Sequence, residues 1–317
     1  MHQFPTGPIR GPTGKSIRAV GLLLAACLLA TPALAQTAGN EGLSPTLANI
    51  KKTHVVRLGY RESSPPFSFL DHSNRPIGYS LELCEAIVEE IGVEVDDANL
   101  KIEYVKVTSD DRIPAVTQSK IDLECGSTTA NAERGKLVAF SPLMFVAGTK
   151  LMVPKASTIS APADLKGKTV VVTKGTTNEQ AMHNVDKKFA LGLNIVTAPD
   201  HEQSYQTLVD GKADAFATDD ILLYGLIAQH KAQARFKVTG EYLSYDPYGI
   251  MFRKGEPQLA AVVERTFRKL GSNRDLIPLY NKWFVARLPT GEKLGVSISP
   301  QLEEAFKVLD DTQGSSN

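Results

Sequence analysis

The sequence predicts an α/β protein of two lobes, each a mainly parallel sheet flanked by helices. Three observations support this fold class. Short β-branched runs alternate with helical segments, a pattern typical of parallel α/β units. The alternation occurs in two successive series along the 317 residues. Two extended stretches, 138–153 and 245–252, join the series, and two such crossings would form a hinge.

The first series supplies lobe 1. We expect strands at 54–59, 101–106 and 121–125, and helices at 80–91 and 112–118. Apolar residues in the first helix recur at three- or four-residue steps and form one stripe: Leu81, Cys84, Val88 and Ile91. We therefore expect Cys84 in the core. Helices at 257–270 and 299–309, with a helical stretch around Trp283, are expected to pack back on this lobe.

The second series supplies lobe 2. We expect strands at 169–173, 194–198 and 213–217, and helices at 178–189 and 202–209. The predicted division places 36–146 and 247–317 in lobe 1 and 147–246 in lobe 2.

The two series repeat one spacing. Asp122 and Asp214 each follow a helix, and each lies five residues before a polar residue beyond the next strand, Ser127 or Asp219. This spacing puts polar groups at the carboxyl ends of equivalent strands. Ligands bind at that edge in open α/β sheets.

Residues 1–35 have the pattern of a secretory signal peptide. Basic residues precede an apolar run at 19–30, and small residues follow at 33–35, so we expect a mature chain that begins at Gln36. The run is shorter than the roughly 20 residues that span a membrane, so we expect a periplasmic protein without membrane insertion after cleavage. An alternative is a lipoprotein cleavage box at 24–27, which would leave a lipidated Cys27.

Charge and cysteine content limit the function classes. Removing the three basic residues of the signal segment leaves 32 Lys and Arg against 35 Asp and Glu. That slightly acidic balance argues against a nucleic-acid partner or an anionic membrane surface. Cys84 and Cys125 remain, and they could form one disulfide in an oxidising compartment or stay as two separately buried thiols.

Several motifs resemble one protein family. The strings are RESSPPFSF at 61–69, TSDDRIP at 108–114, DLECGSTTANAERGK at 122–136, ADLKGKTVVVTKGTTNE at 163–179, DH at 200–201, DDILL at 219–223 and YG at 248–249. The chain resembles the polar-amino-acid solute-binding proteins of ABC importers, and within them the glutamate- and aspartate-binding members. These relatives carry Cys where this chain has Ile250 and lack Cys84, so a disulfide carried over from them is in doubt.

The resemblance implies a periplasmic-binding-protein fold with two hinge crossings. It implies capture of glutamate or aspartate between the lobes, followed by delivery to the permease subunits of an ABC transporter. We expect a monomer with no catalytic residues, no cofactor and no metal ion. Two other functions are a sensory module for a membrane receptor and a binding protein for a different polar amino acid. An enzyme is disfavoured because the G-x-S-x-G and H-E-x-x-H motifs are missing.

An acidic amino acid presents two carboxylates and one ammonium, so its burial requires partners for all three charges. For the α-carboxylate, Arg134 offers a planar fork, and Ser127 and Thr129 offer a hydroxyl and backbone N–H groups. From the opposite lobe, Thr176 and Thr177 lie at a helix start, where N–H groups favour an anion. The alternatives are helix capping for the two threonines and a solvated charge for Arg134.

Asp219 is the expected partner of the ammonium. The neighbouring Asp220 is the competing candidate for this role, and one of the two aspartates is expected to cap the following helix. For the side-chain carboxylate the candidates are Arg61, Ser109, Arg112 and His201. Three of these have a structural alternative: a surface ion pair with Glu62 for Arg61, a solvated helix start for Arg112 and a purely structural role for His201. With a pKa near 6.5, His201 would gain charge as the pH falls and strengthen anion capture.

Overall fold

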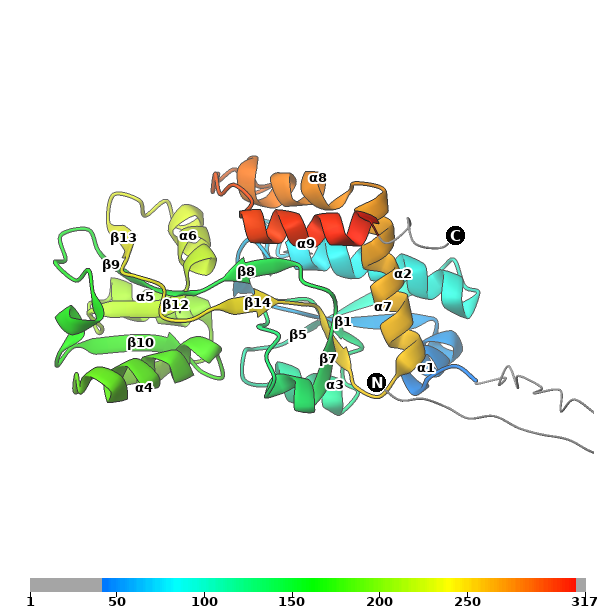
Figure 1. Cartoon of the computed structure of the whole chain (residues 1–317), viewed down its shortest axis with the longest axis horizontal. Coiled ribbons are helices and arrows are strands. Elements are labelled where there is room, and N and C mark those ends of the chain that lie inside the picture. Colours follow the sequence, from blue (N-terminus) through cyan, green and yellow to red (C-terminus); the bar gives the residue numbers. More distant parts are fainter. Residues whose placement is uncertain (1–41, 312–317) are drawn as a thin grey trace, which may run out of the picture. The chain divides into compact units, whose positions relative to one another are not determined.

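The computed structural model describes residues 42–311 (Figure 1). The predicted signal peptide, its cleavage site and Cys27 lie outside the described residues. Within residues 42–311, no helix has both the length and the apolar character needed to cross a membrane.

The first sheet has the strand order β5-β1-β6-β15-β7. Its strands are β1 Val55–Tyr60, β5 Lys101–Lys106, β6 Leu123–Glu124, β7 Val138–Phe140 and β15 Met251–Arg253. β1 is parallel to β5 and β6, whereas β15 is antiparallel to β6 and β7. The helices of this lobe are α1 Pro45–Thr53, α2 Tyr79–Val95, α3 Arg112–Thr117, α7 Pro257–Ser272, α8 Leu276–Tyr280 and α9 Pro300–Asp311, with a 3-10 turn at Arg134–Lys136 and a π-helix at Asn281–Val285. We call this unit lobe 1.

The second sheet has the order β11-β10-β12-β9-β13. Its strands are β9 Thr149–Pro154, β10 Thr169–Thr173, β11 Asn194–Ala198, β12 Ala215–Asp219 and β13 Phe236–Thr239. Its helices are α4 Thr177–Phe189, α5 His201–Val209 and α6 Asp220–Gln229, with a 3-10 turn at Pro162–Leu165. β10 is parallel to β11 and β12, and β9 is antiparallel to β12 and β13. We call this unit lobe 2.

β7 therefore runs in the same direction as β6, and β13 in the same direction as β12. Each sheet thus has four strands that run one way, the three expected parallel strands among them, and one strand that runs the opposite way. The reversed strands are β15 in lobe 1 and β9 in lobe 2. Each lies at the end of a crossing segment and runs back along its sheet instead of following a crossover helix. The reversal that carries the chain between the lobes thus explains why the sheets are mixed.

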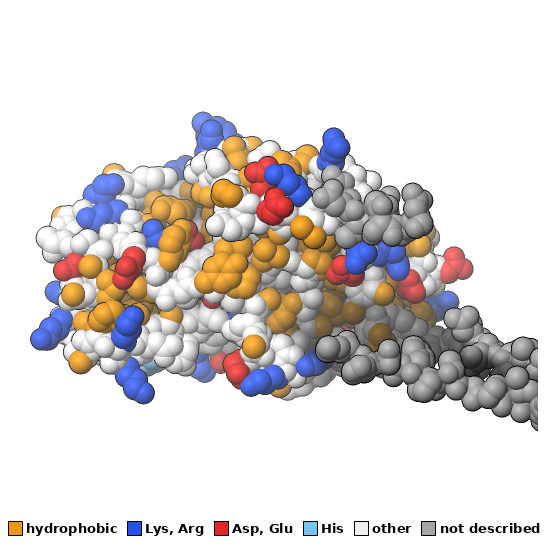
Figure 2. Space-filling view, viewed as in Figure 1, with side chains coloured by type: hydrophobic (Ala, Val, Ile, Leu, Met, Phe, Trp, Pro, Cys, Tyr) orange, Lys and Arg blue, Asp and Glu red, His pale blue; other side chains and the backbone are white. Residues whose placement is uncertain are grey.

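The two crossings lie side by side. β8 Phe145–Ala147 and β14 Asp246–Tyr248 pair as antiparallel strands between the lobes (Figure 1). Apolar side chains gather over them on the face seen in Figure 2, with Lys and Arg around the edges. The predicted lobe boundaries fall within these two strands, and the division at those residues stays a prediction.

A small sheet was not expected from the sequence. It consists of β2 Ser63–Ser64, β3 Ser68–Leu70 and β4 Pro76–Ile77. Strands this short carry too few residues to show alternation. The sheet follows β1 directly in the chain, and Phe67, between β2 and β3, and Phe69 of β3 pack into the lobe 1 core.

The repeated aspartates have the same role in both lobes. Asp122 Oδ2 accepts a hydrogen bond of 2.8 Å from the Arg57 backbone N–H, and Asp214 Oδ2 accepts one of 2.8 Å from Thr169 N–H. Each carboxylate thus secures the strand β1 or β10 beside its own. Because these residues fix the strand starts, β6 and β12 begin after them, at Leu123 and Ala215.

Replacing Asp122 with alanine should lower the free energy of unfolding by about 2 kcal/mol, because it removes the acceptor of the part-buried Arg57 N–H and the carboxylate partner of the Arg57 guanidinium. Asp214→Ala is the matched control, since the Asp214 side chain is 42% exposed and that of Asp122 is 1% exposed. Urea denaturation should show the smaller loss for Asp214→Ala. Equal losses would show that the burial of Asp122 is unimportant.

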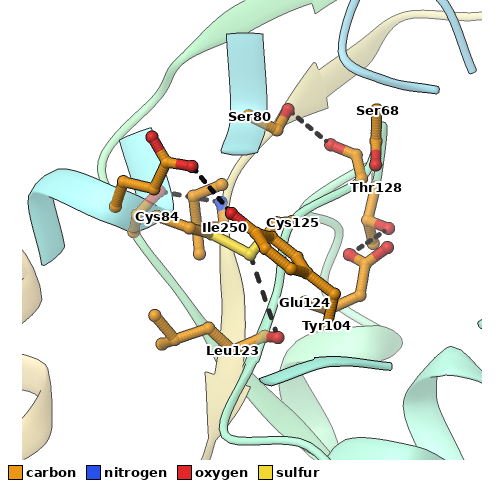
Figure 3. Close-up of a disulfide and its surroundings, with 12 residues drawn as sticks. Ser68, Ser80, Cys84, Tyr104, Leu123, Glu124, Cys125, Thr128 and Ile250 are labelled. Carbon is orange, nitrogen blue, oxygen red and sulfur yellow. Dashed lines mark hydrogen bonds between the residues drawn. A yellow bond between two sulfur atoms is a disulfide. The ribbon is translucent and has the colours of Figure 1, made fainter. Parts of the chain in front are cut away.

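Cys84 and Cys125 form a disulfide that joins α2 to the residue after β6 (Figure 3). Both residues are fully buried, so Cys84 is in the core as expected. Ile250 lies beside the pair. The bridge anchors the start of the loop that carries Ser127 and Thr129.

Candidate binding site

The predicted site residues lie at the carboxyl ends of the strands. Nine of them line one small cavity between the lobes: Ser109, Arg112, Ser127, Thr129, Arg134, Thr176, Thr177, His201 and Asp219. The tenth, Arg61, follows β1 and donates from Nη2 to Ser109 Oγ at 2.5 Å. The fold therefore brings all ten together, although they are spread over 159 positions of the chain.

Three arginines meet at the lobe 1 side of the site. Arg61 and Arg112 are each 2% exposed. Burial, reinforced by the charge of Arg112, lowers the pKa of Arg61 to about 10, and the same two causes lower the pKa of Arg134 to about 10. Burial also lowers the pKa of Arg112. Three guanidinium groups thus share a poorly solvated space and repel one another.

The cluster is not compensated by a carboxylate in direct contact. Within the described residues no ion pair joins these three arginines to an Asp or Glu, although Glu124 acts on all three at longer range. Arg112 Nη1 bonds only a backbone carbonyl, that of Ser109, and Arg112 Nε is buried without a partner in the described chain. A buried N–H without an acceptor is costly. The arrangement is suited to an anion.

The lobe 2 side of the site is the start of α4. The Thr176 hydroxyl caps this helix, accepting from Glu179 N–H at 3.1 Å and donating to the Thr173 carbonyl at 2.7 Å. The capping alternative thus holds for this hydroxyl. Thr177 Oγ1 lies 3.2 Å from Thr129 Oγ1 of lobe 1. Gly175, at φ 75°, leaves its carbonyl facing Arg112 and Arg134, at 3.5 and 3.4 Å.

Asp219 is the acidic group of the cavity. Its Oδ1 accepts from Asn178 Nδ2 at 2.8 Å and its Oδ2 accepts from the Tyr248 hydroxyl. Burial, together with the nearby charge of Asp246, raises the pKa of Asp219 to about 8. A buried carboxyl with this pKa is poised to ionise when a cation arrives.

The expectation that Asp219 or Asp220 caps α6 is wrong. Asp219 occupies the N-cap position but makes no side-chain cap. Its carboxylate turns instead to Asn178 and Tyr248, and Asp220 accepts from the Tyr242 hydroxyl at 2.8 Å.

His201 departs from the expected pH behaviour. Its Nδ1 lies 2.7 Å from Thr173 Oγ1, and the ring is 2% exposed. Burial, then the charges of Arg61 and Arg112, lower the pKa of His201 well below 6.5. The premise of a pKa near 6.5 is therefore wrong, and His201 is neutral across the mildly acidic range.

Two cavity residues were not predicted, Asn178 and Leu222. Asn178 lies within the motif at 163–179, where the sequence pattern predicts only that it begins a helix. Its amide donates to Asp219 and to Thr149 Oγ1, at 2.8 and 2.7 Å. The sequence does not give the side-chain direction that makes these contacts.

Several contacts join the lobes around the cavity. Lys174 of lobe 2 forms an ion pair of 2.9 Å with Asp110 of lobe 1. Gly225 of α6 lies directly against the Pro65 carbonyl, with no room for a Cβ atom. The lobes are therefore closed over the site.

Comparison with known proteins matches residues 56–286 to one family, the bacterial extracellular solute-binding proteins, family 3. The chain belongs to this family. An L-glutamate/L-aspartate-binding protein of Pseudomonas aeruginosa is 40% identical over 89% of this chain and 92% of its own. A glutamate/aspartate import solute-binding protein of Salmonella typhimurium is 36% identical over 86% of this chain and 91% of its own.

The solved structures share the fold of this solute-binding protein. An ancestral arginine-binding protein bound to arginine matches with a TM-score of 0.66 and 31% identity, over 73% of this chain and 98% of its own. The family 3 chain thus has the two-lobed periplasmic-binding-protein fold, with helices flanking mixed sheets. The same fold occurs in a relative named for arginine and in relatives named for glutamate and aspartate, so ligand choice depends on the side chains of the cavity.

Proposed function

We propose that this chain is the periplasmic solute-binding component of an ABC amino-acid importer and that it binds L-glutamate or L-aspartate between its lobes. The observation that carries the ligand assignment is the arginine cluster, which is buried, uncompensated by a contacting carboxylate and opposed by one acidic group. The names of the two relatives at 36–40% identity agree with this assignment.

Each charge of an acidic amino acid has a partner in the proposal. Arg134, Ser127, the backbone N–H of Thr129 and the N-terminus of α4 at Thr176 and Thr177 would receive the α-carboxylate. Asp219 would receive the ammonium. Arg61, Ser109, Arg112 and His201 would receive the side-chain carboxylate, to which neutral His201 can donate one N–H.

A different polar amino acid fits the cavity less well. A cationic side chain would add a charge to the repulsion among Arg61, Arg112 and Arg134. A neutral amide would bring no charge to balance them. A catalytic role is not part of the proposal, since the family model and the two relatives describe binding proteins. A sensory role would require a separate membrane receptor.

The proposed cycle follows from the two crossings. An exported monomer, mature from Gln36, would open and close about β8 and β14, and the ligand would stabilise the closed form. The closed form would then dock on the permease subunits.

Thermal melting tests this function. After unfolding and refolding to remove retained ligand, the protein should melt at least about 5 °C higher with glutamate or aspartate at about 100 times Kd, because ligand at that excess adds about 2.7 kcal/mol. Arginine and glutamine should shift the melting temperature much less. A larger shift with either of them would overturn the ligand assignment.

The pH dependence of binding should follow Asp219. An ammonium beside Asp219 favours its ionised form, so binding expels the proton that the free carboxyl holds below its pKa of about 8. Affinity for glutamate should therefore rise with pH up to about 8, by up to about tenfold per pH unit. Calorimetry between pH 6 and 9 checks this, and Asp219→Asn should remove the slope.

His201 has the opposite sign. A ligand carboxylate would raise its pKa, so protonation of His201 would favour binding as the pH falls. That effect belongs to the acidic range, because the pKa of the free ring lies well below 6.5. His201→Ala should keep the slope between pH 6 and 8. Affinity that grew with acid over that range would contradict both assignments.

A further inference from the structure

Asp246 is a buried carboxylate on the crossing strand β14, and none of the ligand contacts above uses it. It is 2% exposed. Its Oδ1 accepts from Thr129 Oγ1 of lobe 1 at 3.0 Å, and its Oδ2 accepts from Ser244 Oγ. The backbone reinforces the first contact, because Ala130 N–H donates to the Pro247 carbonyl at 2.7 Å. Asp246 thus holds the lobe 1 loop that carries Ser127 and Thr129 against the crossing strand β14.

A chain of hydrogen bonds continues from Asp246 into lobe 2. Ser244 Oγ lies 2.6 Å from Thr149 Oγ1, which accepts from Asn178 Nδ2 at 2.7 Å. The same amide donates to Asp219 Oδ1 at 2.8 Å. Tyr248, two residues after Asp246 on β14, donates to the other oxygen of Asp219.

The hydroxyl hydrogens of this hydrogen-bond network have one consistent arrangement. A hydroxyl has a single hydrogen. Ser244 gives its hydrogen to Asp246, so it accepts from the Thr149 hydroxyl, and Thr149 in turn accepts from Asn178. Thr129 gives its hydrogen to Asp246, so in its contact with Thr177 it is the acceptor. Asp246 therefore sets the direction of the Thr129, Ser244 and Thr149 hydroxyls.

We propose that Asp246 is a positioning residue of the binding site. From the crossing strand it fixes the Thr129 hydroxyl on lobe 1 as an acceptor and, through Ser244, Thr149 and Asn178, holds the Asp219 carboxylate on lobe 2. The inference rests on the proposed function, in which Thr129 and Asp219 contact the bound amino acid. Asp246 thus links the position of Thr129 on lobe 1 to that of Asp219 on lobe 2 through the crossing strand β14.

The pKa of Asp219 is a readout that a purely structural role of Asp246 would not change. Asp219 is faced by Asp246 and Tyr248 of the crossing, by Asp220 and Asn178 of lobe 2, and by Arg112 and Arg134 of lobe 1. After burial, Asp246 is the largest cause of the raised pKa of Asp219, whereas Asp220 is a minor one. Removing the charge of Asp246 should therefore lower the pKa of Asp219.

The test compares Asp246→Asn with Asp220→Asn, which removes an equal charge outside the network. In carboxyl ¹³C NMR of the ligand-free protein, the titration midpoint of Asp219 should be clearly lower in Asp246→Asn than in the wild type and nearly unchanged in Asp220→Asn. At pH 9, Asp246→Asn should still bind glutamate at least about tenfold more weakly, because the Thr129 hydroxyl has lost its charged acceptor.

Ser244→Ala breaks the chain without changing its charge, so it should weaken glutamate binding and leave the midpoint of Asp219 in place. Equal midpoints in wild type and Asp246→Asn, or unchanged affinity at pH 9 in both Asp246→Asn and Ser244→Ala, would overturn the proposal. The NMR titration requires no ligand. A lowered midpoint in a protein that binds no glutamate would therefore support the link from Asp246 to Asp219 and overturn only the proposed function.

Discussion

Arg112→Ala should weaken glutamate binding by about 100-fold or more, because removing one partner of a buried charge pair costs about 2–5 kcal/mol. In the closed protein Arg112 is 2% exposed and its Nε lacks a partner within the described chain, so the ligand carboxylate would be its main counter-charge. Neutral amino acids, which lack the side-chain carboxylate, should lose much less affinity. Calorimetric titration with glutamate and glutamine measures the two losses.

Arg134→Ala is the matched variant, since the proposal assigns Arg134 to the α-carboxylate that every amino acid carries. It should weaken glutamate and glutamine by similar factors. Arg265→Ala removes an arginine of α7 that pairs with Glu90 and Glu94, and it should leave both affinities unchanged. If Arg112→Ala and Arg134→Ala weakened all ligands equally, the division of the cavity into two carboxylate sites would be wrong.

Gly225→Ala should weaken binding at least about tenfold while leaving the ligand-free protein as stable as the wild type or more so. Gly225 lies within α6, where alanine is favoured over glycine by about 1 kcal/mol. In the closed form, however, an added Cβ would overlap the Pro65 carbonyl oxygen and lie 2.9 Å from its carbon. The substitution therefore obstructs lobe closure and favours the helix itself.

The two effects of Gly225→Ala are measured separately. Urea denaturation of the ligand-free protein reports the helix, and calorimetry with glutamate reports closure. Gly225→Ser, with a larger side chain, should bind more weakly than Gly225→Ala. Wild-type affinity in both variants would show that binding does not require the contact between α6 and Pro65.

The elements that the sequence predicted well are those with a clear local pattern. The predicted ranges of β5, β10 and β11 agree with the structure, because the local sequence marks both ends of each of these strands. Strands β6 and β12 were displaced or shortened, because Asp122 and Asp214 act through side-chain bonds to a neighbouring strand. Such bonds depend on strands that are distant in sequence.

The candidate site shows the same limit. Polar residues at strand ends pointed to the cavity. Nine of the ten line it, and Arg61 bonds to Ser109, which is one of the nine. Asn178 and Asp246 were not singled out, since their importance comes from contacts across 41 and 117 residues of sequence. The shifted pKa values of His201 and Asp219 likewise depend on burial and on charged groups distant in sequence, which no local pattern contains.

The ratio of the dissociation constants for glutamate and glutamine, measured by calorimetry on ligand-free wild-type protein at pH 8, tests the central claim most directly. These ligands differ in the side chain, which is a carboxylate in glutamate and an amide in glutamine, and the proposal pairs that carboxylate with Arg61 and Arg112. The account predicts that glutamate binds at least about 100-fold more tightly, since an unpaired buried charge costs about 3 kcal/mol or more. Equal affinity, or a preference for glutamine, would contradict it.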